Sequence, residues 1–97
     1  MGKTITITSR LKWPDVKDNY VMIFDGHTIG RIRRTETAWV WYIELPMAVP
    51  DWASGIAGSL DDCRRAFVPA WLRFLQENSA DRIARAWELE RAAEARL

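Results

Sequence analysis

Residues 20–45 alternate between short apolar runs and turn residues, a pattern that predicts three consecutive β-strands. Residues 20–24 form the first run, and Asp25-Gly26 is a strong signal for a two-residue hairpin turn. The chain returns over 28–34, turns at 35–37 and continues as an apolar run over 38–45. We therefore expect an antiparallel meander over residues 20–45.

The sequence allows two structures for each of the two segments that flank the meander. Residues 3–11 alternate polar and β-branched apolar types, which predicts either a further strand or an N-terminal arm. Trp13-Pro14-Asp15 interrupts this pattern, and residues 15–19, which are polar apart from Val16, are expected to be a connection. Residues 46–58 form a connection that is long for a compact domain, so we expect residues 52–57 to dock on the sheet or to add a short strand.

The period-two pleat assigns the meander residues to two faces. If both hairpins close through two-residue loops, residues that lie opposite each other share a face. One face is then wholly apolar and is expected to be the core: Val21, Ile23, Gly30, Ile32, Trp39, Trp41 and Ile43. The other face collects Tyr20, Met22, Phe24, Ile29, Arg31, Arg33, Val40, Tyr42 and Glu44.

A helix is predicted over residues 59–77. Ser59 can serve as its N-cap, and Asp61 and Asp62 in the first turn complement the positive helix end. Pro69 lies inside the pattern, and because the periodicity continues through it we expect one Pro-kinked helix. Apolar residues recur every three or four positions and should cover the core face of the sheet: Leu60, Cys63, Phe67, Ala70, Trp71, Phe74 and Leu75.

A second helix is predicted over residues 79–96, with Ser79 as its cap. Its apolar face is thin and centres on Ile83, Ala86 and Trp87. Such a helix needs a partner surface, which is the second sheet face or another chain, or else it frays at its end. The whole pattern predicts a single α+β domain over residues 1–97, with the meander packed on the kinked helix and the second helix following.

Composition restricts the function classes. The net charge is +1, which is not the general electrostatic footprint of a nucleic-acid-binding protein. Six Trp in 97 residues are expected to lie mostly in the core. The single cysteine, Cys63, excludes an internal disulfide and favours a reducing compartment. No apolar run suits a membrane span, and the N-terminus does not look like a signal peptide, so we expect a cytoplasmic protein.

Catalytic chemistry has little support in the sequence. The only histidine, His27, follows the Asp25-Gly26 turn and is expected to be exposed, and Cys63 is expected to be buried. One Cys and one His do not make a zinc site, and Gly55–Gly58 lacks the Lys of a phosphate-binding loop. We expect no enzyme activity and no catalytic, cofactor or metal site.

The candidate binding face is the second sheet face. Arg31, Arg33 and Tyr42 are predicted to project from it together, with Tyr20 on the same face and Arg34 at the nearby turn. Arginine beside flat aromatic rings suits phosphate and base contacts. The alternative is that the arginine stems cover apolar neighbours on this face while their charges pair with Glu44 or with helix acids.

Several motifs between residues 20 and 71 follow one another in a fixed order: Asp25-Gly26, Ile29-Gly30-Arg31-Ile32, Trp39 and Trp41, Ser59-Leu60-Asp61-Asp62, and Ala66-Phe67 with Ala70-Trp71. In this order they resemble a family of small uncharacterised proteobacterial proteins, and the resemblance implies no particular function. Cys63 stands where that family usually has Ala. A looser likeness is to plant AP2-type domains and to the arm-binding domains of phage integrases, which bind DNA with Arg and aromatic residues on a sheet face.

We expect a non-catalytic protein-interaction or regulatory module. Its partner would be another protein or a second copy of the chain, with Ile83 and Trp87 of the terminal helix as candidate contact residues. The alternative is a DNA- or RNA-binding domain that uses Arg31, Arg33 and Tyr42.

Overall fold

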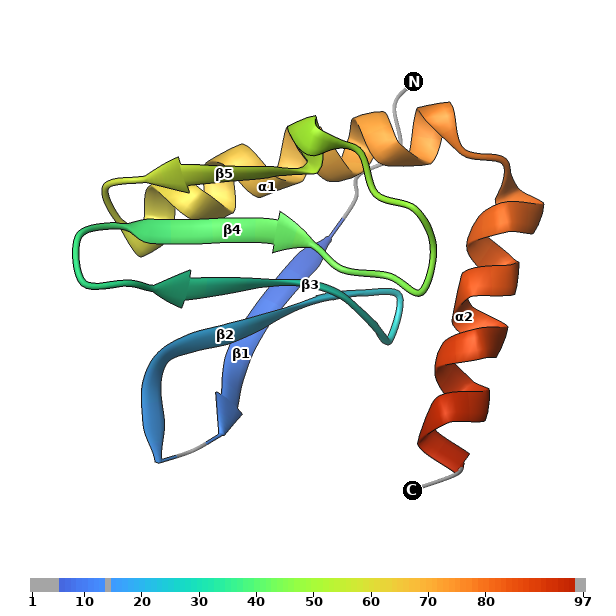
Figure 1. The fold of residues 1–97 in the computed structure, drawn as a ribbon, viewed down its shortest axis with the longest axis horizontal. Helices are drawn as coiled ribbons and strands as arrows, with labels where there is room; N and C mark the ends of the chain where they lie inside the picture. Colours follow the sequence, from blue (N-terminus) through green and yellow to red (C-terminus); the bar gives the residue numbers. More distant parts are fainter. Residues whose placement is uncertain (1–5, 14, 96–97) are drawn as a thin grey trace.

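The structure, a computed structural model, describes residues 6–13 and 15–95. Its strands form one antiparallel sheet in the order β1-β2-β3-β4-β5, with helix α1 against one face and helix α2 beside the ends of the strands (Figure 1). The α+β class is confirmed. The elements are β1 Ile7–Trp13, β2 Val16–Phe24, β3 His27–Arg34, β4 Trp39–Ile43, the 3-10 turn η1 Asp51–Ala53, β5 Ser54–Ala57, α1 Leu60–Glu77 and α2 Ala80–Ala95.

The N-terminal segment is a strand, since β1 pairs along β2; residues 3–5 of the predicted segment lie outside the described residues. The predicted connection over 15–19 is wrong, because β2 begins at Val16 and Trp13 pairs with Val16. In Figure 1 this end of the β1–β2 hairpin projects away from both helices. Polar side chains at that end of the hairpin remain in contact with solvent, because no helix packs against it.

A β-bulge sets the faces of the sheet. The two-residue turn is as predicted, with positive φ at Asp25 (52°) and Gly26 (77°). Ile23 then lies opposite Thr28 but Met22 lies opposite Gly30, so Ile29 is an extra residue in β3. The shift by one residue turns over the faces of β2 relative to β3.

The predicted faces are therefore wrong for β2 and for Ile29, and right for the rest of β3 and for β4. Tyr20, Met22 and Phe24 lie on the side of α1, while Val21 and Ile23 lie on the opposite side. Gly30, Ile32, Trp41 and Ile43 lie on the side of α1 as predicted. Ile29 itself is fully buried, and its carbonyl accepts a hydrogen bond from the Glu44 amide.

Two glycines let large rings approach the sheet. A Cβ atom on Gly30 would stand 2.6 Å from the ring of Phe67 in α1, and one on Gly55 would stand 2.7 Å from the indole of Trp41. Trp41 and Phe67 in turn make an edge-to-face contact with ring centroids 6.1 Å apart. The core thus forms where aromatic rings of α1 and β4 fill the space that the two glycines leave.

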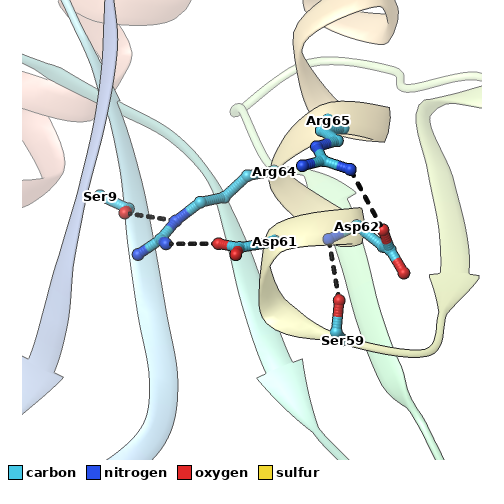
Figure 2. Close-up of polar contacts among 6 residues, drawn as sticks. All are labelled: Ser9, Ser59, Asp61, Asp62, Arg64 and Arg65. Atoms are coloured by element: carbon cyan, nitrogen blue, oxygen red, sulfur yellow. Dashed lines mark hydrogen bonds and ion pairs between the residues drawn. The ribbon is translucent and has the colours of Figure 1, made fainter.

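Helix α1 follows its predicted pattern. The Oγ of Ser59 accepts a hydrogen bond from the Asp62 amide at 3.1 Å, which caps the first turn (Figure 2). The helix continues through Pro69 without interruption. The buried positions are those of the apolar stripe: Cys63, Phe67, Trp71 and Phe74.

The fifth strand and the tryptophans complete the comparison between the predicted and the observed fold. The short-strand alternative for residues 52–57 is confirmed by β5, which pairs antiparallel with β4. Of the tryptophans, Trp41 and Trp71 are buried and three others are partly buried against the core (Trp39, Trp52 and Trp87). Trp13, in contrast, is 49% exposed.

Helix α2 is held to the body of its own chain by its first half. Ser79 accepts a hydrogen bond from the Arg82 amide at 3.2 Å, so the predicted cap is confirmed. Ile83 and Ala86 are buried, and the Trp87 indole stacks on His27 with centroids 4.1 Å apart. His27 is therefore half-buried beneath α2, and the prediction of an exposed turn residue is wrong because α2 packs on the β2–β3 turn.

Candidate interaction surface on the open sheet face

The sheet face opposite α1 carries the residues of interest, and we call it the open face. Its side chains form two rows that run across the strands, because opposed residues in neighbouring strands share a face. The first row is Arg10, Val21, Arg31, Tyr42 and Ser54, and the second is Asn19, Arg33, Val40 and Ile56. Apart from the buried Val21, each row therefore runs from polar or charged residues on β1–β3 to aromatic, aliphatic or small residues on β4 and β5.

The β1–β3 half of the open face is basic. Arg31 is half-buried, and its Nη2 donates to the Asn19 Oδ1 at 2.8 Å, while its buried Nε has no hydrogen-bond partner among the described residues. Arg10 and Arg33 are exposed and form no ion pair with another described residue.

Four of the helix arginines differ from those of the strands, whereas Arg82 and Arg91 of α2 likewise form no ion pair with another described residue. Arg64, Arg65, Arg73 and Arg85 each pair with an acid three or four residues away on the same helix. The positive charge of the open face is therefore left for solvent or for a partner.

The β4–β5 half of the open face is apolar. Ile56 is 75% exposed, and Val40 and Tyr42 beside it are half-buried. An isolated exposed aliphatic residue is ordinary, but Ile56 lies directly beside Val40 in its row and near Tyr42 in the other. The open face thus combines cations that form no ion pair with another described residue with an apolar strip of Val40, Tyr42 and Ile56, of which Ile56 is exposed.

Helix α2 turns one end of the open face into a groove of about 490 Å³. Val21 lies on its floor and is only 7% exposed, whereas Leu89 on α2 remains 43% exposed. The groove includes Glu44 and Glu90 as well as two cations, so its charges are mixed. Its lining is Lys12, Val21, Thr28, Arg31, Glu44, Leu45, Pro46, Leu89, Glu90 and Ala93.

The structure brings together three of the predicted binding residues. Arg31 lies opposite Tyr42 across the β3–β4 ladder, and Arg33 lies two residues further along the same face. Tyr20 is on the other side of the sheet, because of the bulge at Ile29. Arg34 lies opposite Trp39, outside both rows of the open face, with its guanidinium 6.0 Å from that ring.

Tyr20 instead belongs to a contact between α1 and the sheet. The Arg64 guanidinium lies 5.7 Å from the Tyr20 ring, and the Arg64 Nε donates to the Ser9 Oγ at 3.1 Å. Figure 2 shows Arg64 reaching from α1 to Ser9 while it also pairs with Asp61. Tyr20 therefore supports the fold and is unavailable to a ligand on the open face.

Cys63 and His27, the residue types most suited to catalysis, both pack against other side chains. Cys63 is fully buried, and burial, followed by the nearby Asp62 carboxylate, raises the pKa of its thiol above the usual value. His27 stacks on Trp87. In the described part of the chain no three His, Cys, Asp or Glu side chains gather as a metal site would require, and no helix has the length and apolarity to cross a membrane.

Two contributors to the surface were not identified from the sequence. Ile56 and Leu89 are exposed apolar residues at the two ends of the surface, one on β5 and one on α2. The alternation Ser54-Gly55-Ile56-Ala57 contains the signal for Ile56, because Gly55 faces the Trp41 indole and Ile56 must then point away. No sequence signal identified Leu89, since its exposure depends on where α2 docks.

Comparison with known proteins returns no relative: no family model and no curated protein matches the sequence, and no solved structure matches the fold.

Proposed function

We propose that this chain is a non-catalytic protein-interaction module that binds its partner on the open face. One observation carries the proposal: arginines without an ion pair among the described residues share one face of the sheet with an apolar strip that ends in the exposed Ile56, while the other face is filled by α1. Arginine and aromatic residues beside apolar area are typical of binding surfaces between proteins. The free, buried thiol of Cys63 supports a cytoplasmic location for this module.

A protein partner fits the open face better than a nucleic acid. Only one aromatic ring, that of Tyr42, lies in the two rows, whereas stacking surfaces for single strands use several. Val40 and Ile56 provide aliphatic area that contributes little to phosphate binding. The net charge of +1 also favours a protein partner.

The partner is a different protein rather than a second copy bound through α2. Ile83 is 4% exposed and Trp87 stacks on His27, so both side chains already pack within their own chain. Two copies that joined through these residues would first have to release α2. Two open faces placed against each other would set the arginines against those of the other copy or against its apolar β4–β5 half, and neither half of the rows supplies an acid.

A capture experiment with matched variants tests this function. The tagged chain is incubated with extract of the cells that produce it, and the retained proteins are compared with those retained by two double variants. Arg33→Glu with Ile56→Glu alters the open face, and Arg65→Glu with Leu72→Glu makes the same charge change on exposed α1 positions.

We expect a defined protein that is retained by the wild type and by the α1 variant and is lost from the open-face variant, with both variants folded by circular dichroism. Equal retention by both variants, or no specific protein at all, would contradict the proposal.

Nucleic-acid binding is the second candidate, because Arg31, Arg33 and Tyr42 do lie together on the open face. This function predicts binding of a short oligonucleotide that weakens steeply as salt rises and that Arg31→Ala with Arg33→Ala reduces. Open-face amide resonances that do not move when oligonucleotide is added at low salt would exclude it.

A further inference from the structure

The open face and the exposed side of α2 together form one continuous surface. Leu89 and Ala93 of α2 line the groove whose floor includes Val21 and Arg31 of the sheet. In Figure 1, α2 runs across the ends of the strands, not along them. A segment that lies across the strands of the open face would therefore lie alongside α2.

The backbone of such a segment must satisfy its own hydrogen bonds. The amides and carbonyls of β2, β3 and β4 are paired with their neighbouring strands, so the face of the sheet offers side chains and no free ladder positions. An extended peptide would leave its backbone groups unpaired against Val40 and Ile56. A helix makes all its central backbone hydrogen bonds internally.

Charge determines the chemistry of the bound helix. Arg10, Arg31 and Arg33 occupy the β1–β3 half of the rows and form no ion pair with another described residue, although Glu44 and Glu90 line the groove beside Arg31. Val40, Tyr42 and Ile56 occupy the β4–β5 half. The complementary helix carries acidic residues over β1–β3 and apolar residues over β4 and β5.

We propose that the open face binds an amphipathic helix of a partner protein, acidic at one end and apolar at the other, which lies across the strands and packs against Leu89 of α2. This inference rests on the proposed function and names its partner segment. Five strands span about 20 Å, which about 14 helical residues cover. Adjacent helices pack 8–10 Å apart, a separation that allows the bound helix to contact both α2 and the sheet.

Synthetic peptides of about 16 residues test the inference directly on the full chain. The probe has Glu in one half and Leu at helical spacing in the other half. One control replaces every Glu by Lys, a second places Pro in the middle to break the helix, and a third probe is a single-stranded oligonucleotide. Binding is measured by fluorescence anisotropy, and the contact surface is mapped by amide chemical shifts.

We expect the acidic probe to bind with a Kd of about 10 µM and to shift amides of β3–β5 and of the second half of α2. Arg33→Ala and Leu89→Ala should each weaken it about fivefold to tenfold, while Leu72→Ala on α1 should have no effect. Lys-containing and Pro-containing peptides should bind at least about tenfold more weakly.

The inference is overturned if no probe binds, or if the Pro-containing peptide or the oligonucleotide binds as well as the acidic probe. It is also overturned if dilution of the protein alone shifts the open-face amides, since a second copy would then occupy the face. A partner captured through the open face together with failure of the acidic probe would overturn the helix inference alone. Loss of both results would overturn the proposed function as well.

Discussion

Gly30 illustrates how one residue without a side chain determines the packing of a whole face. The Phe67 ring lies 2.6 Å from the position that a Cβ would take, and the backbone carbonyl of Tyr42 is also in contact with that position. Since the carbonyl belongs to the sheet and the ring is fully buried, neither can move without cost. Gly30 therefore determines how closely α1 approaches β3.

Gly30→Ala should lower the free energy of unfolding by about 1–3 kcal/mol, as overpacking in a core does. Gly58→Ala is the matched control, because nothing lies within 4 Å of its Cβ position. Urea denaturation of both variants measures the difference. Equal stability of the two variants would mean that Phe67 does not lie against Gly30.

Cys63 makes stability depend on alkaline pH. Because burial, with Asp62 as the lesser cause, raises the pKa of the thiol, the folded chain keeps a proton that the unfolded chain loses above about pH 8.5. The contribution of this group to stability is thus complete below that pH and is lost as pH rises toward the folded pKa. Between about pH 7 and pH 10 the wild type should lose more stability than Cys63→Ala. Parallel pH profiles of the two proteins would contradict this account.

Pro69 weakens helix α1 at an exposed position. A proline inside a helix removes the hydrogen bond to the carbonyl four residues earlier, here that of Arg65, and its ring crowds the preceding turn. Pro69→Ala should therefore raise the free energy of unfolding by about 1–2 kcal/mol after the entropy gained by the unfolded chain is subtracted. Val68→Ala, at the neighbouring exposed position, should change it by less than about 0.5 kcal/mol. Thermal or urea unfolding measures both, and a destabilised Pro69→Ala would show that the helix needs the proline.

Helix α2 depends on a small set of contacts. It packs through Ile83 and Ala86 and through the stack of Trp87 on His27. Trp87→Ala should speed hydrogen exchange of the α2 amides while those of α1 stay protected, because the two helices are held by different parts of the core. Leu89→Ala is the control and should leave α2 protection unchanged, since Leu89 is largely exposed. Equal loss of protection in α1 and α2 would mean that the two helices unfold together.

At the scale of the whole molecule, local patterns predicted the element types well. Ser59 and the apolar stripe of α1 are visible in the sequence, and so is the turn at Asp25-Gly26. The bulge at Ile29 could not be predicted in the same way, because two-residue turn chemistry is the same with or without an extra residue further along the strand. The place of α2 depends on its contacts with the β2–β3 turn, which residue spacing does not encode.

The sequence predicted the positions of those site residues that follow from the alternation within a strand or from a regular hairpin register. It did not predict the positions that depend on the bulge or on the packing of separate elements. Arg31 and Arg33 share a face because residues two apart in a strand always do, and Tyr42 joins them through the β3–β4 register. Tyr20 was assigned to the wrong face because its position depends on the bulge in the neighbouring strand. Ile56 joins the surface through the pairing of β5 with β4, and Leu89 joins it only through the docking of α2.

The most direct test of the open face as a binding surface is photo-crosslinking inside the cells that produce the chain. A benzophenone amino acid is placed at position 56 on the open face or, as the control, at position 72 on the outer side of α1. We expect one protein adduct from position 56 that resists nuclease and is absent from position 72. A nuclease-sensitive adduct, the same adduct from both positions, or none from position 56 would contradict the account.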